Sequence, residues 1–166
     1  MLPFLSGSGS PRPDARAKGV FYGITLAHGK RHFVRALLES VACMLKSNID
    51  TFRTAGIEVR EIRSFGGGSR SRLWNQIKAD LCGLPVRTSP IAETGCLGAA
   101  ILAGVGSETY ATIEEGCDVL VRLGEPVHPG ESTRSIYEEL YRRYERLALA
   151  VEPLYAGGIY HVDSIR

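Results

Sequence analysis

Three consecutive glycines, Gly66, Gly67 and Gly68, constrain the fold of this chain more than any other feature. They join a short apolar run to a segment with helical character. Because glycine has no Cβ, the triplet lets the backbone turn through positive φ and lets another surface approach it closely. The helix that follows opens with unpaired N–H groups, which suit a phosphate, a carboxylate or a polar ligand edge. The triplet predicts a tight strand-to-helix turn, and a turn that binds nothing is the commoner explanation of such a triplet alone.

The composition is that of one ordinary globular domain. The chain has 166 residues, an apolar fraction of 44% and a charged fraction of 23%. Its formal net charge of +2 predicts no nucleic-acid partner and no anionic membrane surface as a partner. No apolar run reaches the roughly 18 residues of a membrane span. Residues 1–5 lack the length and the basic lead of a signal peptide. The pattern of the four cysteines fits a reducing cytoplasm best, so we expect a cytoplasmic protein.

The four cysteines are widely spaced, with no Cys-x-x-Cys pair and no histidine at ligand spacing. Cys43, Cys82 and Cys96 each lie in an apolar helical pattern. We therefore expect buried free thiols in a reducing compartment, and we predict no metal ligand in this chain.

The periodicity of apolar residues predicts a helix-rich chain with few strands. An amphipathic pattern over residues 31–53 predicts a helix of about 34 Å, with Phe33, Leu37, Val41 and Phe52 on its inward face. The predicted extended segments are 59–65 and 85–88. Further helices are predicted over residues 71–81, 94–105 and 112–122. A last helix is predicted with Ser132 as its cap and with a shared apolar face that runs from Ile136 to Val151.

The predicted helix over residues 94–105 is rich in small side chains and contains Gly98. Glycine inside a helix costs about 1 kcal/mol relative to alanine. Such a helix is expected to pack very close to another backbone, and the glycine turn is its predicted neighbour. The order of elements indicates an α/β layer arrangement. Two strands are too few for an independent sheet of ordinary size, so the chain is expected to be part of something larger.

Common nucleotide-binding and nucleophile motifs are missing from the sequence. The glycine triplet is not G-x-G-x-x-G, and neither G-x-x-x-x-G-K-[S/T] nor G-x-S-x-G occurs. Several arginines flank the triplet, and they either attract a polyphosphate or form a solvated helix face. These residues are Arg60, Arg63, Arg70 and Arg72.

Two ordered motifs resemble those of the FGGY family of carbohydrate kinases, and the xylulokinase branch looks most similar. The first is a family signature of glycines, aromatic and aliphatic residues that ends in an acid, and residues 19–39 fit it at every position. The second is the family's adenosine motif with its helix, which residues 66–74, Ala79-Asp80 and Pro85-Val86 resemble.

Weaker matches lie elsewhere: residues 2–7 and 13–16, Glu93 with Gly98-Ala99-Ala100, and the tyrosine-rich last helix. The resemblance covers residues 1 to about 155. It implies an α/β fold of the ribonuclease-H-like, actin-like ATPase type, incomplete at its N-terminal strands. On this basis residues 1–155 are expected to be a partial C-terminal kinase domain and residues 156–166 a tail.

In the family, sugar and ATP bind between two such domains, and the glycine turn lies against the adenosine. The resemblance therefore assigns nucleotide contacts to Gly66, Gly67, Gly68, Ser69 and Ser71. Ser71 stands where relatives carry asparagine, and it is shorter and has fewer bonding groups. Some adenine contacts are thus expected to be lost or bridged by water.

The family's phosphate loop, phosphate hairpin, sugar-binding residues and catalytic aspartate are expected in sequence that this chain lacks. Phosphoryl transfer needs positioned phosphates, Mg²⁺ and a base for the acceptor hydroxyl. ATP and Mg²⁺ are therefore expected in the complete enzyme, whereas no residue here is expected to be catalytic and the chain alone is expected to be inactive.

The first hypothesis for function is the nucleotide-binding C-terminal part of an ATP-dependent sugar kinase. Joined to its N-terminal domain, which binds the sugar, it would phosphorylate a ketose or polyol hydroxyl. The alternative is a free-standing, non-catalytic nucleotide-binding or oligomerisation module, in which a homo-oligomer covers the apolar face.

Overall fold

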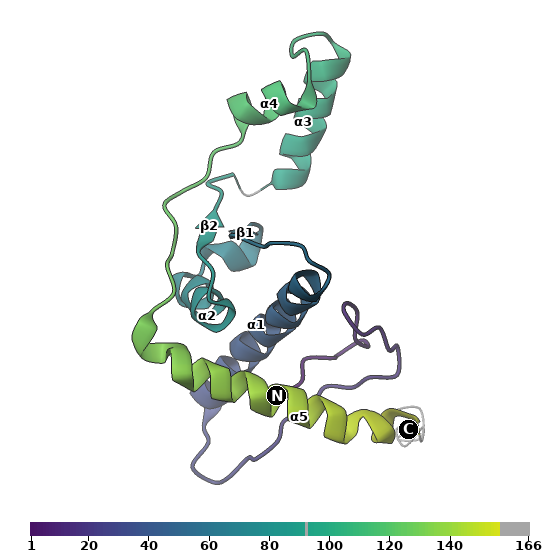
Figure 1. The fold of residues 1–166 in the computed structure, drawn as a ribbon, viewed down its shortest axis with the longest axis vertical. Helices are drawn as coiled ribbons and strands as arrows, with labels where there is room; N and C mark the ends of the chain where they lie inside the picture. Colours follow the sequence, from purple (N-terminus) through teal and green to yellow (C-terminus); the bar gives the residue numbers. More distant parts are fainter. Residues whose placement is uncertain (92, 157–166) are drawn as a thin grey trace.

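The computed structural model describes residues 1–91 and 93–156 (Figure 1). The tail predicted over residues 156–166 lies outside this range except for Ala156, which ends the last helix. The helices are α1 (Lys30–Thr54), α2 (Arg72–Cys82), α3 (Thr94–Gly106), α4 (Ile113–Leu120) and α5 (Arg134–Ala156). The strands are β1 (Ile62–Ser64) and β2 (Val86–Thr88), and short 3₁₀ helices span Gly67–Arg70 and Glu131–Thr133.

The larger of two regions, here called the body, comprises residues 1–88 and 124–156. In it α5 passes across the lower end of α1 and lies below α2 in Figure 1. The tyrosines of α5 face α1: Tyr137 OH accepts a hydrogen bond from the Arg35 guanidinium at 2.6 Å, and Tyr141 OH lies 3.1 Å from Ser47 Oγ. The buried core between these helices consists of Leu2, Ala42, Cys43, Ile77, Leu81, Tyr137, Tyr141 and Tyr144.

The sheet consists of β1 and β2, which are parallel, with Ile62 opposite Val86 and Ser64 opposite Thr88. The glycine turn and α2 form the crossover between them, as parallel strands require. The strand predicted over 59–65 is observed only at its C-terminal half, because β2 is just three residues long and pairs with no more of it. In the described part of the chain, β1 has no strand neighbour on its outer edge.

Helix α1 has the predicted position, but its predicted inward face is wrong in part. Leu37 and Phe52 are 39% and 49% exposed, whereas Ala42, Cys43 and Ile49 are buried. The apolar pattern of this helix is wide, and α2 and α5 cover only the part of it that faces them. A stripe of apolar side chains on α1 therefore remains at the surface.

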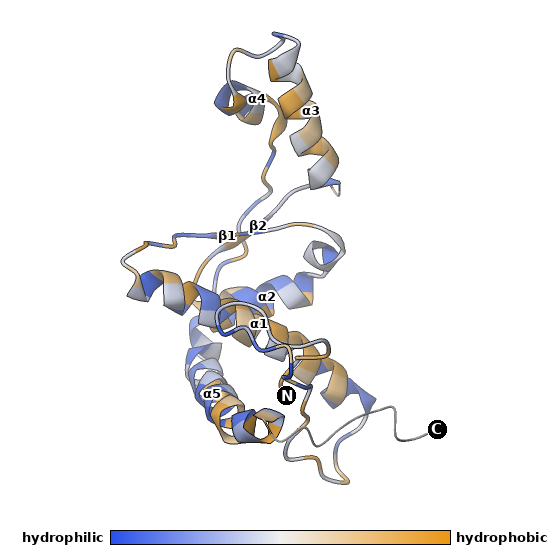
Figure 2. Cartoon of the chain, turned by 90° about the vertical axis from the view of Figure 1, so that its right-hand side faces the viewer, coloured by the Kyte–Doolittle hydropathy of each residue, from blue (hydrophilic) through white to orange (hydrophobic). Residues whose placement is uncertain are grey.

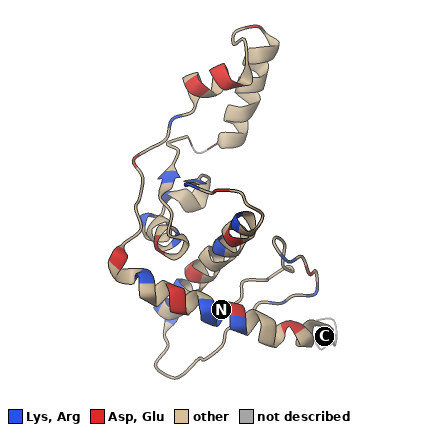
Figure 3. Cartoon of the chain, in the orientation of Figure 1, with Lys and Arg blue, Asp and Glu red and all other residues tan. Residues whose placement is uncertain are grey.

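The second region, here called the hairpin, comprises residues 89–123 and stands apart from the body (Figure 1). Its helices α3 and α4 pack around Tyr110, and a Cβ at Gly104 would lie 2.6 Å from the Tyr110 ring. Helix α3 is apolar and carries no charge (Figures 2 and 3), yet Ile101 is its one buried residue.

Two predictions for the hairpin are wrong. A Cβ at Gly98 would meet nothing within 4 Å among residues 1–91 and 93–156, so this glycine marks no close approach to the glycine turn. The cause is that the chain after β2 carries α3 away from α2. For the same reason Cys96 is exposed, although its apolar pattern predicted burial. No helix in the described residues is long and apolar enough to cross a membrane.

Candidate functional site

The glycine turn, residues 66–71, connects β1 to α2 and is fixed at both ends. Gly66 has φ of 75°, a conformation that favours glycine. Its carbonyl accepts hydrogen bonds from Ser69 N at 3.1 Å and from Ser69 Oγ at 2.7 Å. At the other end Ser71 caps α2, since its Oγ accepts a hydrogen bond from Trp74 N at 3.2 Å.

The described structure explains the missing side chain at two of the three glycines of the turn, Gly66 and Gly68, but not at Gly67. Gly66 needs its positive φ, while a Cβ at Gly68 would lie 2.6 Å from the Trp74 ring. Gly67 has neither constraint: its φ is not in the left-handed region, and a Cβ there would meet no described residue within 4 Å. Gly67 is also exposed, so its bare backbone is open to a molecule that approaches from outside.

Side chains of α2 hold the turn in place. Trp74 Nε1 donates to the Leu38 carbonyl on α1 at 3.1 Å, which fixes the ring against Gly68. Lys78 Nζ lies 4.6 Å from the centre of the same ring and donates to Ser64 Oγ at 3.0 Å. Burial lowers the pKa of Lys78. Together these contacts tie the end of β1, the turn and α1 to one another.

Sequence reasoning placed Trp74 inward but missed Lys78. Residues four apart on a helix lie on one face, so the Trp74–Lys78 spacing was a usable signal for this cation–π contact. It also missed Asn75, which is buried and donates from Nδ2 to the Ser69 carbonyl at 2.7 Å. Asparagine inside a helix gives no such signal, because its partner depends on the shape of the turn.

The four arginines around the turn divide into two pairs. Arg60 and Arg63 form ion pairs with Glu58 and Glu61 at 2.8 and 2.7 Å. The other two, Arg70 and Arg72, are exposed and form no ion pair with a described residue. The positive charge that is free to act at the turn therefore comes from Arg70 and Arg72.

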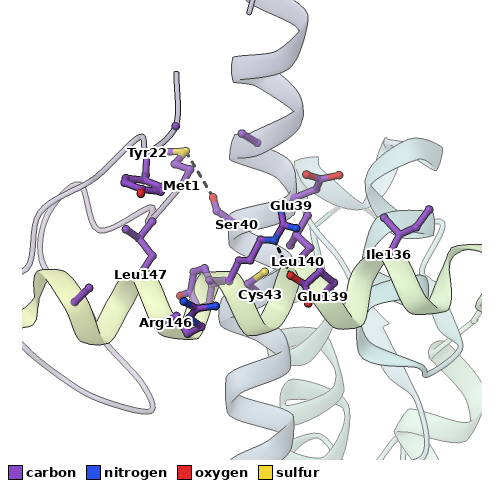
Figure 4. Close-up of a pocket in the computed structure, with 15 residues that line it drawn as sticks. Met1, Tyr22, Glu39, Ser40, Cys43, Ile136, Glu139, Leu140, Arg146 and Leu147 are labelled. Atoms are coloured by element: carbon purple, nitrogen blue, oxygen red, sulfur yellow. Dashed lines mark hydrogen bonds and ion pairs between the residues drawn. The ribbon is translucent and has the colours of Figure 1, made fainter. Parts of the chain in front are cut away.

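A cavity of about 1060 Å³ lies elsewhere, between the N-terminal segment, α1 and α5 (Figure 4). No residue of the glycine turn lines it. Its lining charges include Glu139 and Arg143, which pair with each other at 2.8 Å. Burial raises the pKa of the lining thiol Cys43 to about 12, so this thiol stays protonated and is a poor nucleophile near neutral pH. Cys43 is therefore not an activated nucleophile in this cavity.

Comparison with known proteins shows which family of proteins contains this glycine turn. The family model described as the C-terminal domain of the FGGY family of carbohydrate kinases matches residues 1–107. The chain belongs to the FGGY family. A xylulose kinase of Staphylococcus epidermidis is 35% identical over 145 residues, which are 87% of this chain and 29% of that protein. The L-xylulose/3-keto-L-gulonate kinase of Escherichia coli is 30% identical over 155 residues, 93% of this chain and 30% of that protein.

Solved FGGY structures agree with this assignment. The xylulose kinase of Rhodospirillum rubrum superposes with a TM-score of 0.77 at 30% identity, over 93% of this chain and 31% of that one. The glycerol kinase of Plasmodium falciparum, solved with ADP, gives 0.72 at 27% identity, over 89% and 30%. The predicted family and actin-like ATPase fold are confirmed, and the chain spans about a third of the length of these relatives. The domain boundary at residue 155 stays a prediction.

Proposed function

We propose that this chain is the nucleotide-binding C-terminal part of an ATP-dependent sugar kinase of the xylulokinase type. The observation that carries the proposal is Gly67, an exposed glycine for which the described part of the chain gives no reason to lack a side chain. An approaching ligand supplies that reason. Membership of a kinase family, one of whose members was solved with ADP, makes a nucleotide the ligand of choice.

In this proposal the backbone of Gly66, Gly67 and Gly68 lies against the adenosine. Ser69 shapes the turn, since its Oγ is committed to the Gly66 carbonyl. The Ser71 oxygen already accepts from Trp74 N, so its O–H is the group left to bond the nucleotide. Serine thus offers one donor where asparagine offers an amide with two donors and an acceptor.

The complete enzyme would transfer a phosphoryl group from ATP to a ketose or polyol hydroxyl. That reaction needs a sugar site, held phosphates and Mg²⁺. The described residues contain no group of three or more His, Cys, Asp or Glu side chains that fits a metal, so the proposal assigns no Mg²⁺ ligand to them. The chain contributes nucleotide binding, and the chemistry belongs to the rest of the kinase. We propose a cytoplasmic location because all four cysteines are free.

The test is a titration of the chain with ADP and Mg²⁺, followed by calorimetry and by tryptophan fluorescence. Trp74 is the single tryptophan, and its ring lies against Gly68, so it reports on the turn directly. We expect saturable binding, which Gly67→Asp abolishes through bulk and a negative charge beside the phosphates. Gly98→Asp is the matched control, because that glycine is equally free of contacts but lies in the hairpin. Unchanged ADP affinity in Gly67→Asp would remove the turn from the nucleotide site.

A second candidate is a free-standing, non-catalytic module for nucleotide binding or oligomerisation. The exposed apolar side of α3 favours it, since Leu102 is 60% exposed on a helix without charges. Light scattering over a range of concentrations separates the two. A stable dimer that Leu102→Arg disrupts supports the module, whereas a monomer that binds ADP supports the kinase part.

A further inference from the structure

Asn75 joins α2 to the glycine turn from a buried position. Its side chain is 4% exposed, which makes it one of two buried polar residues, with Ser40, in the described ranges. Its Nδ2 donates to the Ser69 carbonyl at 2.7 Å. Because a carbonyl only accepts hydrogen bonds, the NH₂ group must face Ser69, and this fixes the orientation of the amide.

The other half of the amide, Oδ1, is buried and has no hydrogen-bond partner among the described residues. A buried acceptor without a partner destabilises a fold, and native structures contain few of them. Leucine has nearly the same shape as asparagine and would remove this cost, which offsets the loss of the Nδ2 hydrogen bond to the Ser69 carbonyl. Stability of the body therefore does not account for asparagine at this position.

The donor half of the amide, Nδ2, does account for the asparagine at position 75. Ser69, whose carbonyl Asn75 holds, also bonds the Gly66 carbonyl through both its backbone N and its Oγ. Asn75, Ser69 and Gly66 thus form a chain of hydrogen bonds that runs from α2 to the start of the turn. Gly67 lies inside the loop that this chain closes, so its backbone position depends on the Asn75 amide.

We propose that Asn75 is a positioning residue, which sets where the Gly67 backbone lies at the expense of fold stability. Its consequence for nucleotide binding rests on the function proposed above. A merely structural residue would lose stability on replacement. A positioning residue with an unpartnered Oδ1 should instead lose turn order and ligand affinity while stability is kept.

The test is Asn75→Leu in the full chain, with three readouts. We expect the urea midpoint of unfolding to stay the same or rise. We expect amide hydrogen exchange at Gly67, Gly68 and Ser69 to become about tenfold faster, and ADP affinity to fall about tenfold, the equivalent of one hydrogen bond. Should the leucine variant not fold, Asn75→Ala removes the same donor without adding bulk.

The matched control is Asn48→Leu on α1. Asn48 Nδ2 also donates to a backbone carbonyl, that of Met44 at 2.9 Å, but it lies far from the turn in the chain. This variant should leave the turn amides and ADP affinity unchanged. A lower midpoint in Asn75→Leu with unaltered exchange at the turn would overturn the positioning role. If the native chain binds no ADP, the proposed function fails for the chain alone, and exchange and unfolding still decide the role of Asn75.

Discussion

The body and the hairpin bury their apolar residues to very different extents. Three helices and the N-terminal segment enclose the core of the body, so Leu2, Cys43 and Ile77 are almost fully buried. In the hairpin, α3 is apolar on all sides but has one main partner, α4. A helix that is apolar all round is typical of one surrounded by protein. The apolar character of a helix alone therefore does not show whether the surface that covers it belongs to the same region of the chain.

Truncating one isoleucine in each region tests most directly whether the body is packed more firmly than the hairpin. Ile77→Ala should lower the free energy of unfolding by about 2–5 kcal/mol, because a cavity opens among well-packed neighbours. Ile101→Ala in α3 should cost clearly less, since its surroundings are open and can collapse onto the gap. Denaturant unfolding measures both changes. Equal losses would show that the hairpin is packed as firmly as the body.

The cysteines give the second comparison, since two lie in each region. Burial raises the pKa of both Cys43 and Cys82 in the body from the ordinary thiol value of 9.0 to about 12. Cys96 in the hairpin is exposed. At pH 8 a thiol reagent should modify Cys96 at least about 100-fold faster than the two body thiols, which react only on unfolding.

The raised pKa values of Cys43 and Cys82 also predict how the stability of the body depends on pH. Their folded-state pKa lies above the unfolded value, so their contribution to stability is fully present below pH 9 and is lost between about pH 9 and 12. A rapid reaction of all four thiols at pH 8 would contradict both the burial and the raised pKa.

The smallest effect is expected on the surface of α3. Leu102→Ser should change the free energy of unfolding by no more than about 0.5 kcal/mol, because the side chain is 60% exposed. Calorimetric or denaturant unfolding of the variant checks this. A loss above about 2 kcal/mol would mean that the chain itself covers this face, and the contrast between body and hairpin would then disappear.

The elements of the fold were largely predictable from the sequence, whereas their partners were not. Periodicity located α1, α2 and α5, and the glycine turn located the β1–α2 junction. Periodicity did not reveal which stripe of α1 is buried, because burial depends on which other segments pack beside this helix. The predictions that Gly98 packs against the glycine turn and that Cys96 is buried were wrong for the same reason. A small or apolar residue indicates that something packs against it, but the sequence does not show which segment does so.

The candidate site shows the same limit. The family motif marked Gly66, Gly67 and Gly68 as one unit. The structure gives Gly66 and Gly68 different reasons to lack a side chain, the positive φ of the first and the Trp74 ring against the second. The spacing of residues in the sequence encodes neither. Asn75 and Lys78 were missed because polar residues within a helix usually face solvent. Their roles follow from the shape of the turn that they support.

The way in which the hairpin is attached has a consequence for how freely the family can vary. Residues 89–123 leave the body after Thr88 and return at Gly124, whose N donates to the Thr88 carbonyl at 2.8 Å. Val86 and Val127 then exchange two hydrogen bonds, which closes the neck behind the excursion. An excursion whose ends already meet can grow or shrink at little entropic cost to the body. It is thus an insertable module, which evolution or an engineer can exchange while β2 and the glycine turn keep their places.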